Sequence, residues 1–215
     1  MENNRLLLVE GKNDMHVVLA LVAHHSFHPE FGIRSEYGRR DEKRGEGGGF
    51  EHMLKELPVI LRTKGLQRLG IVVDADLDLS KRWGSLSTTL KKAGYVRMPK
   101  LPEVEGTVVD ENNMPKVGVW LMPDNRLPGM LEDFLALIRP EGEVLWERAG
   151  RSVDDIPREE RRFADVHRSK AVIHTYLAWQ EEPGAPLGQS ITKRSFNPDS
   201  GHAMRLISWL SRLFA

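Results

Sequence analysis

Short apolar runs alternate with amphipathic stretches through the first half of the chain. Residues 5–9 and 69–73 are largely apolar runs of the kind that form strands buried on both faces of a sheet. A further candidate strand spans Ile33–Tyr37. Apolar residues at helical spacing predict helices over about 12–24, 50–63 and 81–93. This order of elements predicts an α/β fold with an open, mainly parallel sheet flanked by helices.

The pattern changes after residue 94. Two candidate strands, 106–110 and 117–122, are joined by a turn-rich segment, and the remaining chain reads as helical. The predicted helices cover about 130–138, 144–148, 166–180 and 200–214. We therefore expect residues 1–140 to form the α/β domain and residues 141–215 to form a helical extension packed on the same domain.

The amino-acid composition excludes several kinds of functional site. Lys plus Arg and Asp plus Glu each number 31, so any affinity for nucleic acid must come from a local patch or a bound cation. The absence of cysteine excludes disulfides, thiolate zinc sites, iron–sulfur clusters and cysteine nucleophiles. The longest purely apolar run, Val17–Ala23, is too short to span a bilayer, and the first apolar run is too short for a signal peptide. A cytoplasmic, soluble protein without membrane contact is the expectation.

Acidic residues follow two of the predicted strands. Glu10 comes directly after the first strand, and Asp74 and Asp76 follow the strand at 69–73. Ligands of open parallel sheets bind outside the carboxyl ends of the strands, which places both groups where sites occur. Asp74 and Asp76 share one side for as long as the chain stays extended, and Glu10 joins them if the two strands are neighbours.

Three carboxylates at one spot require a compensating charge. Two unit charges about 4 Å apart repel by on the order of 4 kcal/mol at an effective dielectric constant of 20. An all-oxygen set of ligands favours a hard cation, so we expect Mg²⁺ or Mn²⁺ among Glu10, Asp74 and Asp76. The competing interpretation is that Asp74 and Asp76 begin a polar loop and cap the helix that follows.

These residues carry a resemblance to a known family. The segment Leu6–Asp14, followed 64 residues after Glu10 by Asp74-Ala75-Asp76, resembles the Toprim domain of topoisomerases, bacterial primases, recombination proteins and OLD-family nucleases. The resemblance covers about residues 5–138, and the stretch 117–133 looks like a Toprim-like branch related to the OLD-family domains. It implies that Glu10 takes part in acid–base chemistry or binds metal and that the Asp-x-Asp pair holds Mg²⁺. It further implies that Glu132 and Lys170 join the site.

The chain also departs from the better-known Toprim enzymes. Its three tyrosines have no recognisable topoisomerase setting, and it has no zinc ribbon of the primase type and no ATPase of the OLD type. The resemblance therefore supports a metal site more strongly than any one reaction.

Other polar residues have two interpretations each. Lys12 either contacts a substrate phosphate or is a solvated lysine in the first turn of a helix, and Asp78 is either a further metal group or an exposed loop residue. The segment Arg34–Arg44 contains the best basic patch of the chain, which either contacts nucleic acid or is a solvated loop. His24, His25 and His28 suggest zinc, but basic residues at a helix C-terminus are favoured by the helix dipole in any case.

These observations predict Mg²⁺-dependent phosphodiester chemistry, with a nuclease acting on nucleic acid as the leading hypothesis and Glu10, Lys12 and Lys170 as catalytic residues. A non-catalytic Toprim-like module that binds nucleotides or nucleic-acid ends through Mg²⁺ is the alternative. A phosphatase with Asp74 as nucleophile is a weaker alternative, because Glu10 would then have no role. An EF-hand is excluded, since Leu79 and Ser85 stand where that loop needs glycine and glutamate. DNA, RNA and small nucleotides remain open as substrates, as does the oligomeric state.

Overall fold

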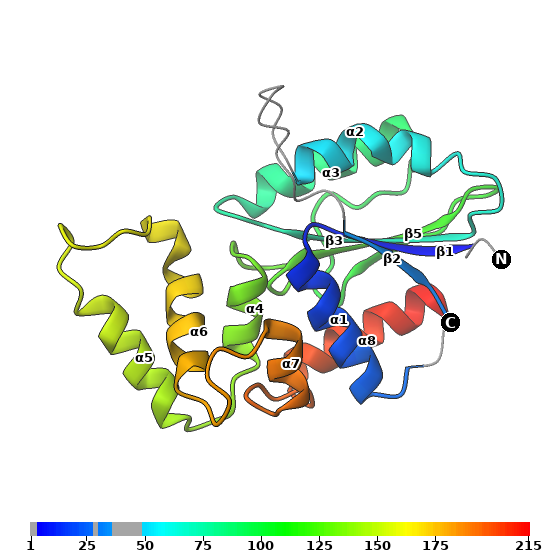
Figure 1. Ribbon diagram of the computed structural model, residues 1–215. Helices are drawn as coiled ribbons and strands as arrows, with labels where there is room; N and C mark the ends of the chain where they lie inside the picture. Colours follow the sequence, from blue (N-terminus) through cyan, green and yellow to red (C-terminus); the bar gives the residue numbers. More distant parts are fainter. Residues whose placement is uncertain (1–3, 28–29, 36–48) are drawn as a thin grey trace.

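Five strands form one open sheet in the computed structural model, which describes residues 4–27, 30–35 and 49–215. They are β1 (Arg5–Val9), β2 (Gly32–Arg34), β3 (Arg68–Asp74), β4 (Thr107–Val109) and β5 (Lys116–Met122). Their order is β2-β1-β3-β5-β4; the first four are parallel, and β4 runs antiparallel to β5 (Figure 1). The expected α/β fold with an open, mainly parallel sheet is confirmed.

Helices cover both faces of this sheet. On one face lie α2 (Phe50–Ile60) and α3 (Leu79–Lys92), and on the other lie α1 (Lys12–His24) and α8 (Gly201–Phe214) (Figure 1). The remaining helices are α4 (Leu131–Leu137), α5 (Val144–Asp154), the 3₁₀ turn η2 (Asp165–His167), α6 (Arg168–Ala178) and α7 (Leu187–Thr192). None of the described helices combines the length and apolar character that a bilayer crossing requires.

The central strands β1, β3 and β5 are mostly apolar because each contributes to two cores. Successive side chains of a strand point to opposite faces. Leu7 and Val9 accordingly belong to the core shared with α1 and the C-terminal helices, whereas Leu8 packs toward α2 and α3. On β5, Trp120 likewise belongs to the core shared with α1, and Leu121 belongs to the core under α2 and α3. This double burial explains why the sequence shows continuous apolar runs instead of alternation.

The last helix is part of the sheet's own core. Gly70 and Gly118 lie opposite each other on β3 and β5, and both face α8. A Cβ atom on Gly118 would lie 2.6 Å from Cδ2 of Leu213, so only glycine lets the helix approach this closely. Trp209 adds a hydrogen bond from Nε1 to the carbonyl of Thr107 at 3.1 Å. The C-terminal helices therefore complete one face of the α/β fold.

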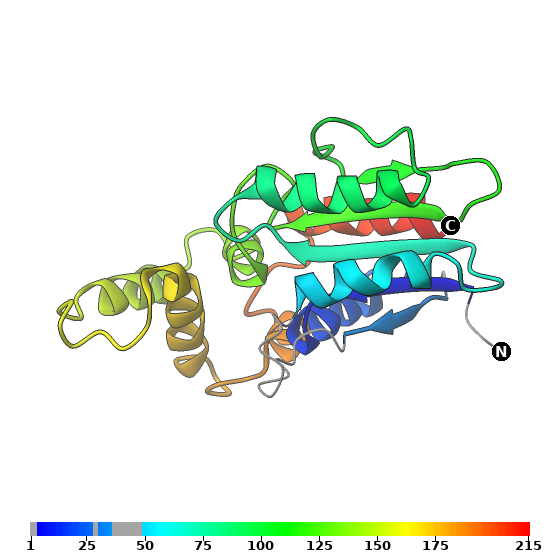
Figure 2. The ribbon, with the colours of Figure 1, turned by 90° about the horizontal axis from the view of Figure 1, so that it is seen from above.

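Helices α5 and α6 pack on each other as a hairpin that projects beyond the carboxyl ends of the strands (Figures 1 and 2). The hairpin is longer than the sequence indicated, since α5 continues to Asp154. The short helix α7 was not predicted, because Pro183–Gly188 reads as a loop up to its first residues. Helix α2 continues past Pro58 to Ile60. Of the predicted strand Ile33–Tyr37, β2 contains the start, and its last two residues lie outside the described ranges.

Candidate functional site

A pocket of about 550 Å³ opens at the carboxyl ends of β1 and β3. Its polar lining comes from the end of β1, the first turn of α1, the end of β3, the start of α4 and α6. The lining residues are Glu10, Gly11, Lys12, Asn13, Asp14, Gly49, Asp74, Leu131, Glu132 and Lys170. The structure thus brings together five of the residues that the sequence singled out: Glu10, Lys12, Asp74, Glu132 and Lys170.

Strand pairing places the first two carboxyl groups together. Val9 is in register with Val72, so the chain leaves β1 at Glu10 beside the last residues of β3. The backbone N–H of Asp74 donates to Oε2 of Glu10 at 3.3 Å. Oδ1 of Asp74 in turn accepts from the backbone N–H of Leu131 at 3.0 Å. These two bonds tie the ends of both strands to the N-terminus of α4.

Asp14 is a site residue to which the sequence reasoning gave no role. It lies one helical turn after Glu10 and is only 6% exposed. Its Oδ2 accepts from the N–H of Gly11 at 3.1 Å, but the buried Oδ1 has no hydrogen-bond partner. Burial, together with the negative charge of Glu10, raises the pKa of Asp14 to about 7. The sequence does place Asp14 four residues after Glu10, but an acidic residue at the third position of a helix is explained equally well by helix capping.

Glu132 completes a group of four carboxyl groups. Its side chain is buried, with the residue 5% exposed, and its Oε1 lies 3.8 Å from Nζ of Lys170. Burial raises the pKa of Asp74 well above its ordinary value, and the charges of Asp14, Glu10 and Glu132 raise it further. Four carboxyl groups thus face two lysines, Lys12 and Lys170, in one pocket. If all four carboxyl groups are ionised, the pocket has an excess of negative charge, and a cation would relieve it.

The donors fit a hard divalent cation. All four are carboxylate oxygens, and the partnerless oxygen of Asp14 provides a buried acceptor for it. The carboxylate oxygens of the pocket are farther apart than the ligands of one metal ion. Within the described ranges, the only group of three possible ligand residues whose ligand atoms lie within 4.8 Å of one another is His24, His25 and Asp199, which is outside this pocket. Mg²⁺ commonly binds one or two protein carboxylates and keeps several waters, so the pocket need not contract fully around it.

Asp76 and Asp78 lie outside the carboxylate pocket. The chain does not stay extended after Asp74: Asp76 has a φ of +52° and pairs its backbone with Gly129. Its carboxylate forms an ion pair with Arg82, whose guanidinium lies 4.0 Å from the ring centroid of Phe50. Asp74 and Asp76 therefore do not share one side as expected.

Asp78 caps α3 by accepting from the N–H of Lys81 at 2.9 Å. It lines a second pocket of about 350 Å³ together with Asp76 and Arg82. Asp78 is exposed, and it does not line the carboxylate pocket.

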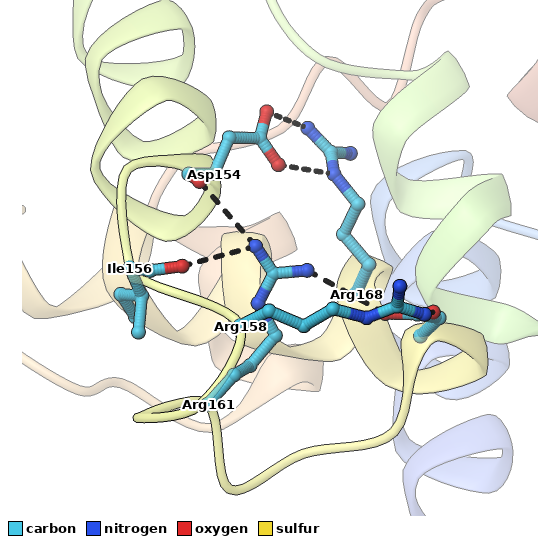
Figure 3. A network of polar contacts seen from close by, with 6 residues as sticks. Asp154, Ile156, Arg158, Arg161 and Arg168 are labelled. Carbon is cyan, nitrogen blue, oxygen red and sulfur yellow. Dashed lines mark hydrogen bonds and ion pairs between the residues drawn. The ribbon is translucent and has the colours of Figure 1, made fainter.

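The projecting hairpin positions Lys170. Arg168, two residues earlier on α6, donates from Nε and Nη2 to the two carboxylate oxygens of Asp154 on α5, at 2.7 and 2.6 Å. Arg161 donates to the carbonyls of Asp154 and Ile156 in the connecting segment (Figure 3). Exposed ion pairs contribute at most about 1 kcal/mol each, so their main effect is to orient α6 against α5.

Only the start of the predicted basic segment lies within the described residues. Arg39, Arg40, Lys43 and Arg44 of the basic segment lie outside the described residues. Arg34 is described and pairs with Glu56 at 2.9 Å.

Comparison with known proteins identifies the family. No curated protein and no solved structure matches the chain. The family described as "Protein of unknown function (DUF3226)" matches residues 4–215. This match spans the whole α/β fold, including the carboxylate pocket and the C-terminal helices. The chain therefore belongs to the DUF3226 family.

Proposed function

We propose that this protein is a Mg²⁺- or Mn²⁺-dependent phosphodiester hydrolase that acts on nucleic acid. The observation that carries the proposal is the convergence of Glu10, Asp14, Asp74 and Glu132 on one pocket at the carboxyl edge of the sheet. Two of these carboxyl groups are buried, and one has an oxygen without a partner. Structural carboxylates are seldom gathered in this way, because their mutual repulsion destabilises the fold unless a cation binds.

The resemblance to Toprim domains supports the same reaction class. Glu10 and Asp74, which match the two family motifs, lie at the carboxyl ends of neighbouring strands and are linked by a hydrogen bond. Glu132 and Lys170, the other two residues that the resemblance implies, line the same pocket. Asp76 departs from the pattern through its ion pair with Arg82. We therefore assign the ligand role to Glu10, Asp14, Asp74 and Glu132 and leave Asp76 outside the ligand set.

The residues of the pocket divide into two chemical roles. A bound divalent cation would supply positive charge to polarise the phosphoryl group and to favour ionised water as the nucleophile. Without a cation the pKa of Asp14 is raised to about 7, and a bound cation would favour the ionised form of Asp14, which is the form that can act as a ligand beside Glu10. Lys12 and Lys170 are exposed at the pocket, where their ammonium groups can bind phosphate oxygens.

Hydrolysis assays with purified full-length protein test the proposal. Single- and double-stranded DNA and RNA are incubated with Mg²⁺, with Mn²⁺ or with EDTA. We expect cleavage only with a divalent cation and its loss in Glu10→Gln and Asp74→Asn. Asp110→Asn is the matched control, since Asp110 is exposed and pairs with Lys116 at 3.7 Å. All variants are purified identically, so that cleavage shared by every preparation identifies a contaminant.

The other outcomes contradict the proposal in distinguishable ways. Mg²⁺ binding without cleavage of any substrate would identify a non-catalytic binding module. Hydrolysis of phosphomonoesters without cleavage of nucleic acid would identify a phosphatase. Cleavage that persists in Asp74→Asn would place the active site outside this pocket.

A further inference from the structure

A second cluster of metal-binding side chains lies at the opposite end of α1 from the carboxylate pocket. His24 is the last residue of α1, and His25 follows it directly. The tertiary structure brings Asp199, from the segment before α8, against them: Nε2 of His24 lies 2.8 Å from Oδ1 of Asp199. One ligand atom from each of the three residues lies within 4.8 Å of the other two.

We propose that His24, His25 and Asp199 bind a transition-metal ion, with Zn²⁺ as the best fit. Two imidazole nitrogens and one carboxylate oxygen are a common protein ligand set for zinc, whereas Mg²⁺ prefers oxygen alone. Tetrahedral ligands at zinc distances are about 3.3 Å apart, so the widest pair, which is at most 4.8 Å apart, must contract by up to about 1.5 Å. The side chains of His24 and Asp199 are 27% and 55% exposed, which leaves both free to make this adjustment.

Hydrogen bonds from neighbouring groups orient the proposed ligand residues. Arg194 donates from Nη1 to Oδ2 of Asp199 at 2.8 Å and so leaves Oδ1 turned toward His24. The carbonyl oxygen of Pro198 lies 2.9 Å from Nε2 of His25 and adds an oxygen donor beside the cluster. Metal ligands are commonly oriented by outer hydrogen bonds of this kind.

The position of the cluster gives the ion a structural effect. It would link the C-terminus of α1 to the segment that leads into α8, and these two helices pack on the same face of the sheet. An ion that binds only the folded chain stabilises it by mass action. Zinc binding is therefore expected to raise the melting temperature independently of the carboxylate pocket.

Calorimetric titration of the full chain with ZnCl₂ tests the site, with excess Mg²⁺ present to occupy the carboxylate pocket. We expect one Zn²⁺ per chain and about tenfold or greater loss of affinity in each of His24→Gln, His25→Gln and Asp199→Asn. His174→Gln is the matched control, because His174 is exposed on α6 away from the cluster. Circular dichroism and melting temperature in EDTA establish that each variant is folded.

Three results would overturn the proposal. Unchanged zinc affinity in all three cluster variants would show that the ion binds elsewhere. Loss of zinc binding in Glu10→Gln, with retention in His24→Gln, would place it in the carboxylate pocket. Co²⁺ gives an independent readout: its visible absorption in wild type should be lost in His24→Gln and His25→Gln and retained in His174→Gln. A Co²⁺ spectrum unchanged by the histidine substitutions would also contradict the site.

Discussion

The backbone N–H of Asp74 donates a hydrogen bond to Oε2 of Glu10 at 3.3 Å, across 64 residues of sequence. The bond exists because β1 and β3 are parallel neighbours in register, so the residues that follow them leave the sheet side by side. It brings two carboxyl groups together without a side-chain donor between them.

Replacing Asp74 should separate folding from cation binding. Asp74→Asn replaces a carboxyl group whose ionisation is disfavoured by burial and by three neighbouring carboxyl groups, so the unfolding free energy in EDTA should equal or exceed that of wild type. The amide can still accept the hydrogen bond from Leu131. The stabilisation by Mg²⁺, about 2.7 kcal/mol in wild type at a hundredfold excess over its dissociation constant, should largely disappear. Melting temperatures in EDTA and in Mg²⁺ measure both effects.

Asp76→Asn is the informative control for this experiment. Because Asp76 pairs with Arg82 outside the pocket, its replacement should preserve the Mg²⁺ shift and lower stability by no more than about 1 kcal/mol. A Mg²⁺ shift lost in Asp76→Asn but kept in Asp74→Asn would reverse the ligand assignment.

Stability without divalent cations should fall as pH rises toward neutrality. The pKa of Asp14 is raised from 3.8 to about 7 in the folded protein. The stability that the protonated carboxyl group contributes to the fold is therefore fully present below pH 3.8 and is lost as the pH rises through about 7. Asp14→Asn should remove this dependence. The difference in unfolding free energy between wild type and variant should therefore decrease by up to about 1.4 kcal/mol per pH unit in this interval.

Urea titrations in EDTA at several pH values give these free energies. The coupling to Asp74 means that the pair, not Asp14 alone, sets the shape of the curve. A difference that is flat, or that increases with pH, would show that Asp14 is ionised in the folded protein throughout.

Gly49 should be needed for the position of Glu10. Its φ is +71°, and a Cβ atom there would lie 2.9 Å from Oε1 of Glu10. Gly49→Ala should therefore strain the backbone by about 1–3 kcal/mol and also weaken Mg²⁺ binding. Gly65→Ala is the matched control, since Gly65 has a φ of +85° and nothing within 4 Å. Equal Mg²⁺ shifts in the two variants, measured by thermal melts, would contradict the contact with Glu10.

Gly118 should be needed for the docking of α8. Gly118→Ala forces a methyl group against Leu213, and overpacking of this kind typically costs about 1–3 kcal/mol. Gly84→Ala, in the middle of α3 with nothing within 4 Å, should instead stabilise the protein by roughly 0.5–1 kcal/mol. Denaturant unfolding measures both values. A neutral Gly118→Ala would show that α8 packs more loosely on the sheet than the structure describes.

The sequence by itself determined the fold class and most of the elements. The apolar runs at β1 and β3 and the helical periodicity of α1, α3 and α8 are local patterns, and each follows from burial of one or both faces of its element. Glu10 and Asp74 were also predictable as neighbours, because the carboxyl ends of parallel strands meet at one edge of a sheet. The extent of α5 and the short α7 were not predicted, since charged and proline-rich segments carry little periodicity.

Only the tertiary structure decided which acids share the pocket. Asp76 was predicted as a ligand and Asp14 was not, yet Asp14 is buried beside Glu10 in the pocket and Asp76 forms an ion pair with Arg82 outside it. The positive φ of Asp76 depends on its pairing with Gly129, more than fifty residues away, and the pairing of His24 with Asp199 spans 175 residues. Local pattern fixes which face of an element is buried, but contacts between distant segments determine which charged groups lie together, because the side chains that neutralise or displace one another come from different elements.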